Sequence, residues 1–87
     1  IEYRSDRIRR IASRFLRPDE SAGSTDDLLT CWCVKEAVYK LRSASHLAYD
    51  QMRVHLDTAT ADDLLAADSL SFGREITADY VLVWTSE

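Results

Sequence analysis

The apolar residues change their spacing near residue 43, and this change limits the possible fold more than any other feature of the chain. Before it, apolar side chains recur every three or four positions, which is typical of amphipathic helices. After it, they alternate with polar side chains, which is typical of strands buried on one face. The sequence therefore predicts an α+β domain, with two helices packed on an antiparallel sheet of three or more strands.

Two helices are expected in the first half, and Ser5 or Asp6 is expected to cap the first of them. The first ends before Pro18, because the residue preceding a proline disfavours the helical conformation. Its apolar stripe consists of Ile8, Ile11, Ala12 and Phe15. Ser24 or Thr25 caps the second helix, which runs to about residue 41 or 42.

Three strands are expected in the second half. Alternating or β-branched and aromatic residues mark them at 52–56, 69–73 and 80–84. Residues 76–79 form the turn between the last two strands. The segment 60–67 fits a short helix or an edge strand equally well.

Size, charge and cysteine content limit the classes of protein to which this chain can belong. The 87 residues suit one domain, 1–87, and no run of 18 apolar residues indicates a membrane span. Residues 1–17 carry a net charge of +4 and residues 18–87 a net charge of −8, so a basic segment can attract an acidic partner. Cys31 and Cys33 point away from each other on a helix, which favours buried free thiols and a cytoplasmic protein.

Glu36 and Lys40 stand one turn apart on the second expected helix, so their side chains share a face and can reach one small site. By spacing alone, the pair is more typical of an exposed ion pair contributing roughly 0.3 kcal/mol. The surrounding residues favour a functional role over that simpler explanation.

The string Trp32-Cys33-Val34-Lys35-Glu36-Ala37-Val38-Tyr39-Lys40 resembles the W/F-x-x-K-E-A-x-x-K signature of the 4′-phosphopantetheinyl transferase superfamily. Two flanking elements extend the resemblance. The segment from Arg14 to Glu20 is similar to the family's R-F-x-x-x-E element, and Ile1-Glu2 is similar to the end of its G-[IV]-D-[IV]-E strand. The likeness covers residues 1 to about 41.

The resemblance implies an enzyme that moves 4′-phosphopantetheine from coenzyme A to a serine of an acyl or peptidyl carrier protein. Mg²⁺ would be held by Glu2 and Glu36. Glu36 would also orient or deprotonate the serine, Lys40 would contact a phosphate of coenzyme A and assist the departing nucleotide, and Lys35 would be a second phosphate contact.

The resemblance also implies partners. The aspartate of the strand motif would precede Ile1, and Leu41-Arg42-Ser43-Ala44 stands where family members often have glycine. Tryptophan at the start of the signature, Trp32, resembles the longer surfactin-synthetase-activating type, so we expect the C-terminal half of such a protein, or a fragment of that half. A second half-domain or identical subunits would complete the active site. As in short family members, the first helix would dock a carrier protein, here through Arg7, Arg10 and Arg14.

Alternative interpretations remain at the level of the sequence. The arginines equally fit a solvated basic face, and a nucleic-acid-binding surface is disfavoured because aromatic residues are scarce near them. A non-catalytic remnant of the same fold that binds a carrier protein or subunit is the second hypothesis. Trp32 and Trp84 are expected in the core. His46 and His55 are expected at the surface or a sheet edge, with no assigned role.

Overall fold

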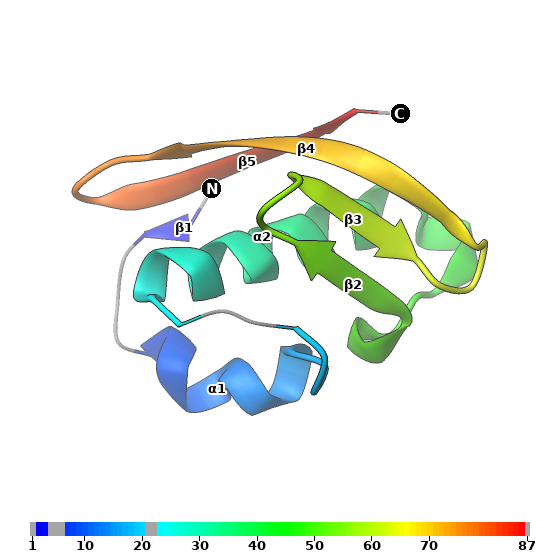
Figure 1. Ribbon diagram of the computed structural model, residues 1–87, viewed down its shortest axis with the longest axis horizontal. Coiled ribbons are helices and arrows are strands. Elements are labelled where there is room, and N and C mark those ends of the chain that lie inside the picture. Colours follow the sequence, from blue (N-terminus) through cyan, green and yellow to red (C-terminus); the bar gives the residue numbers. More distant parts are fainter. Residues whose placement is uncertain (1, 4–6, 21–22, 87) are drawn as a thin grey trace.

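The computed structural model describes residues 2–3, 7–20 and 23–86 (Figure 1). Its helices are α1 (Arg7–Phe15) and α2 (Thr25–Leu41), followed by the short 3₁₀ turns η1 (Ser43–Ser45) and η2 (Tyr49–Gln51). Its strands are β1 (Glu2–Tyr3), β2 (Met52–His55), β3 (Thr60–Asp63), β4 (Asp68–Ile76) and β5 (Tyr80–Ser86).

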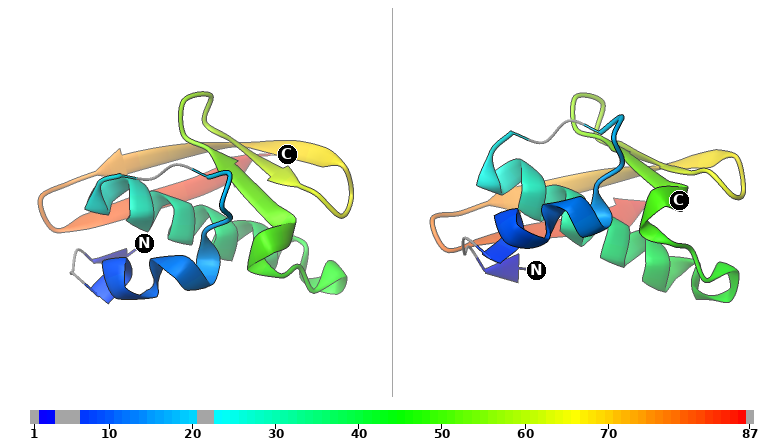
Figure 2. Two further views of the ribbon diagram at one scale, coloured as in Figure 1. Left: turned by 60° about the horizontal axis from the view of Figure 1, so that its bottom comes forward. Right: turned by 90° about the horizontal axis from the view of Figure 1, so that it is seen from below.

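Within these residues the strands form one antiparallel sheet in the order β1-β5-β4-β3-β2. Helix α2 lies across one face of the sheet, with most of its contacts to β5, and α1 packs on α2 (Figures 1 and 2). The opposite face of the sheet carries no helix in the described part of the chain. The predicted α+β class is confirmed.

The local signals explain most of these elements. The hydroxyl of Ser24 caps α2 by accepting a hydrogen bond from the Asp27 amide at 3.1 Å. The three expected strands are present, and the ambiguous segment 60–67 forms β3 followed by a turn. The caps expected for the first helix, Ser5 or Asp6, lie outside the described residues.

The core fills the space between α2 and the sheet. Both cysteines are buried, as expected, and burial raises the pKa of the Cys31 thiol to about 12. The fully buried apolar side chains at its centre are Phe15, Val34, Val38, Met52 and Val81.

Trp84 corrects one expectation. Its side chain is 52% exposed instead of lying in the core. Val81 and Val83, which share the opposite face of β5, supply the packing against the helices, so Trp84 projects from the outer face of the sheet. There the indole lies over Gly73, where an added Cβ would come within 2.5 Å of it. Trp84 is therefore an outer-face residue that needs glycine as its cross-strand neighbour.

Within the described ranges, no helix combines the length and the apolar character needed to cross a membrane.

Candidate functional site

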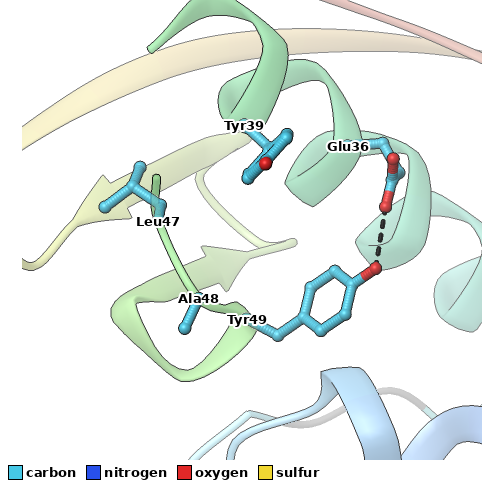
Figure 3. A pocket seen from close by; sticks show the side chains of 5 residues that line it. All are labelled: Glu36, Tyr39, Leu47, Ala48 and Tyr49. Atoms are coloured by element: carbon cyan, nitrogen blue, oxygen red, sulfur yellow. Dashed lines mark hydrogen bonds between the residues drawn. The ribbon is translucent and has the colours of Figure 1, made fainter. Parts of the chain in front are cut away.

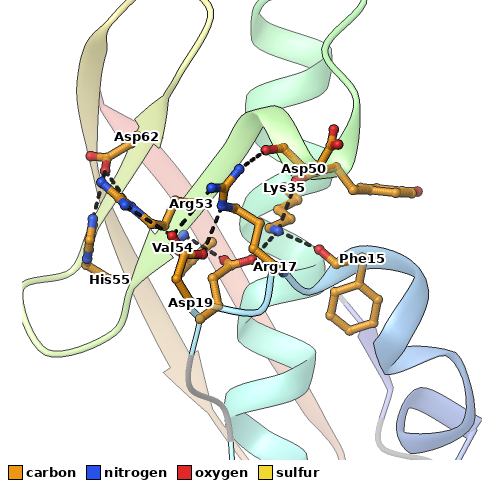
Figure 4. Close-up of polar contacts among 11 residues, drawn as sticks. Phe15, Arg17, Asp19, Lys35, Asp50, Arg53, Val54, His55 and Asp62 are labelled. Atoms are coloured by element: carbon orange, nitrogen blue, oxygen red, sulfur yellow. Dashed lines mark hydrogen bonds and ion pairs between the residues drawn. The ribbon is translucent and has the colours of Figure 1, made fainter.

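A buried ion pair joins two of the motif segments. The ammonium of Lys35 on α2 lies 2.5 Å from Oε1 of Glu20, and both side chains have 0% exposure (Figure 4). The same ammonium donates to the carbonyl oxygens of Phe15 at 2.5 Å and Tyr49 at 3.1 Å. Three acceptors thus surround the three N–H donors of Lys35.

Glu20 is satisfied from the other side by backbone amides. Its Oε1 accepts from the amide of Arg17 at 2.7 Å, and its Oε2 accepts from the amide of Val54 on β2 at 2.8 Å. The pair therefore fastens the end of α1, the middle of α2, η2 and β2 to one another. The phosphate contact expected of Lys35 has no support in this geometry, because its ammonium is enclosed by protein.

Glu36, the next residue of α2, faces a different environment. Its half-buried carboxylate lines a pocket of about 380 Å³ (Figure 3). The remaining lining residues are Tyr39, Leu47, Ala48 and Tyr49. Oε1 of Glu36 accepts a hydrogen bond from the hydroxyl of Tyr49 at 2.9 Å. A single carboxylate at the edge of an otherwise largely apolar pocket can orient a ligand or accept a proton.

Tyr49 was not predicted as a site residue. Its ring packs against Trp32, with centroids 5.7 Å apart, and Trp32 in turn contacts Phe15 edge-on at 5.4 Å. Burial, and then the hydrogen bond to Glu36, raise the pKa of the Tyr49 phenol. The phenol is therefore a hydrogen-bond donor at neutral pH.

Lys40 is exposed in the last turn of α2, one turn beyond Glu36. A cation at this position also interacts favourably with the C-terminal end of the helix dipole. The expected shared face of Glu36 and Lys40 is present, although Lys40 does not line the pocket.

The expected metal site is only partly within the described residues. The backbone of Glu2 is in β1, paired with Val81, and its side chain lies outside the described part. Among the described residues, no group of three or more His, Cys, Asp or Glu side chains is arranged to hold a metal ion. Of the two carboxylates expected to hold the metal ion, Glu2 and Glu36, only the side chain of Glu36 lies within the described part of the chain.

The three arginines of the expected docking surface are exposed on α1. Arg7, Arg10 and Arg14 follow the spacing i, i+3, i+7, which places them on one face of the helix. Arg9, on another face, donates to the hydroxyl of Thr25 at 3.1 Å. The structure thus presents a basic stripe, which we define as Arg7, Arg10 and Arg14.

A second charged cluster lies on β2 and β3 (Figure 4). Asp62 accepts hydrogen bonds from Arg53 and Ser69 and contacts Nε2 of His55 at 2.8 Å. Burial disfavours the charged carboxylate, but hydrogen bonds from His55, Ser69 and Arg53 outweigh it and lower the pKa of Asp62 to about 2. His55 thus lies on the edge strand β2, as expected, and His46 is exposed.

Comparisons with models of protein families, with curated proteins and with solved structures found no match to this chain.

Proposed function

We propose that this protein transfers 4′-phosphopantetheine from coenzyme A to a serine of an acyl or peptidyl carrier protein. The observation that carries the proposal is the buried pair of Glu20 and Lys35, at 2.5 Å. It unites two segments that resemble separate motifs of the transferase superfamily. It also leaves Glu36, the next motif residue, at a pocket.

In the proposed reaction, the serine oxygen attacks the phosphorus atom that carries the pantetheine arm. The phosphoanhydride bond to 3′,5′-ADP breaks, and the bond from serine to phosphorus forms. Glu36 accepts the serine proton, directly or through a water molecule. Lys40 attracts the phosphates and stabilises the charge that accumulates on the leaving nucleotide.

The described residues offer one carboxylate, Glu36, to the expected magnesium ion. Mg²⁺ in phosphoryl-transfer sites is typically bound by one or two carboxylates together with substrate phosphates and water. Glu36 offers one carboxylate beside the pocket, and Glu2 is the second that the resemblance implies. When bound, the cation would neutralise charge on the phosphate oxygens.

Glu36→Gln tests the proposal directly. The amide keeps the size of the side chain and an acceptor for Tyr49, but it cannot take the serine proton. We expect transfer to fall by at least about a hundredfold, with little change in thermal stability because the side chain is half-buried. The assay incubates the full-length protein with coenzyme A, Mg²⁺ and an apo carrier protein, and it follows the mass of the carrier protein.

Two results would contradict the proposal. If Glu36→Gln transfers at the rate of the unaltered protein, Glu36 does not accept the serine proton. No transfer by the unaltered protein to fatty-acid, polyketide or peptide carrier proteins would remove the activity itself. Asp50→Asn is a suitable control, because Asp50 is an exposed carboxylate on η2 that does not line the pocket.

A second function is favoured by the basic stripe, which suits an acidic partner whether or not transfer occurs. In that case the protein binds a carrier protein without modifying it. Reversing Arg7, Arg10 and Arg14 to glutamate should weaken binding at low salt and flatten its dependence on salt. Binding of unrelated oligonucleotides with equal strength would instead support a nucleic-acid partner.

A further inference from the structure

The carboxylate of Glu36 is held by a residue from a distant part of the chain. Among the described hydrogen bonds, it receives one from the hydroxyl of Tyr49 at 2.9 Å and none from Tyr39, although both tyrosines line the pocket (Figure 3). A carboxylate has about four lone-pair sites, so this bond leaves acceptor capacity for a substrate proton. Tyr49 thus restricts the orientation of Glu36 without using up its ability to act as a base.

Tyr49 is itself fixed from two directions. Its ring packs on Trp32, which precedes Glu36 by one turn of α2. Its carbonyl oxygen accepts from the buried ammonium of Lys35 at 3.1 Å. The turn that carries it is closed by the Gln51 side chain, which accepts from the Ala48 amide at 2.9 Å.

We propose that Tyr49 is a positioning residue, which orients the carboxylate of Glu36 for proton transfer and is itself set in place by Lys35. This inference rests on the proposed function. Tyr49→Phe, a substitution of nearly equal size, tests the role of the hydroxyl alone. The ring packing against Trp32 and the contact of the backbone carbonyl with Lys35 remain, while the hydroxyl is lost.

The kinetic test compares Tyr49→Phe with Asp50→Asn, a change at the next residue that lies outside the pocket lining. A hydrogen bond to a charged group is worth enough to change a rate by about ten- to a hundredfold when it acts in the transition state. We expect kcat of Tyr49→Phe to fall by this factor, with KM for coenzyme A nearly unchanged. Asp50→Asn should retain kcat, and both variants should keep the thermal midpoint of the unaltered protein.

A readout independent of activity follows the Tyr49 phenol by NMR with ring-labelled tyrosine. Because the hydroxyl of Tyr49 donates to the charged carboxylate of Glu36 at 2.9 Å, Glu36→Gln should shift the resonance of the ring carbon that bears this hydroxyl, measured at one fixed neutral pH.

The outcomes separate the two proposals. Equal kcat for Tyr49→Phe and the unaltered protein, or an unchanged Tyr49 ring resonance in Glu36→Gln, overturns the positioning role while transfer stands. Absence of transfer by the unaltered protein overturns the proposed function and the catalytic part of this inference with it. A parallel loss of kcat and thermal stability in Tyr49→Phe assigns the residue to folding and also overturns the positioning role.

Discussion

Two charged clusters in this protein use similar groups in opposite surroundings (Figure 4). In the cluster of Glu20 and Lys35, both side chains have 0% exposure. In the cluster around Asp62, the side chains of Arg53 and His55 are 36% and 37% exposed. Water can replace a lost partner in the second cluster but not in the first, so burial determines which cluster holds the fold together.

The largest expected effect comes from breaking the buried pair at one end. Lys35→Met removes the ammonium and leaves Glu20 as a buried carboxylate without a cation. We expect the free energy of unfolding, measured with urea, to fall by about 3–5 kcal/mol. Lys40→Met on the exposed side of the same helix is the matched control, with an expected change within about 0.5 kcal/mol. Similar losses in the two variants would show that burial does not set the difference.

Removing the second charge sharpens the comparison. Glu20→Gln keeps an oxygen that can accept from the amide of Arg17 or Val54, but it carries no charge. Combined with Lys35→Met, it should recover at least about 1 kcal/mol of the stability lost in the single variant, because no uncompensated ion remains in the interior. The same urea titration measures the recovery. A double variant less stable than Lys35→Met alone would exclude the uncompensated charge as the cause.

The smallest effect is expected at the exposed cluster, and it should depend on pH. Asp62→Asn should lower stability by about 1 kcal/mol or less near neutral pH. The pKa of Asp62 is about 2 in the folded protein and 3.8 as an ordinary value, so its contribution is present above pH 3.8 and disappears as pH falls through 2. Denaturation curves of both proteins should therefore converge in this range. A difference that persists undiminished at pH 2 would contradict the assignment.

Much of the fold could be predicted because it depends on the spacing of apolar and polar residues that are close together in the sequence. The cap at Ser24 and the strand periods require only neighbouring residues. The prediction that Trp84 lies in the core is wrong for a physical reason. Alternation indicates which residues of a strand share a face, but it does not indicate which face the helices cover. That choice depends on how β5 packs on α2.

The candidate site was less predictable. The spacing of Glu36 and Lys40 gave their shared helix face, and the motif resemblance drew attention to Glu20 and Lys35. It did not reveal that these two pair with each other, since their 15-residue separation crosses the loop between the helices. Tyr49 lies after an irregular segment with no periodicity, and tertiary contacts with Trp32 and Lys35 bring its hydroxyl to Glu36.

The Lys35 ammonium affects which substitutions this domain can accept, because it contacts a residue of the pocket wall from the interior. One side chain links the interior to the wall of the pocket through the carbonyl of Tyr49. Substitutions that shift α1 or β2 by a fraction of an ångström will be transmitted to the pocket wall, because packed interiors transmit strain. The shape of the pocket and the stability of the domain are therefore coupled in this chain.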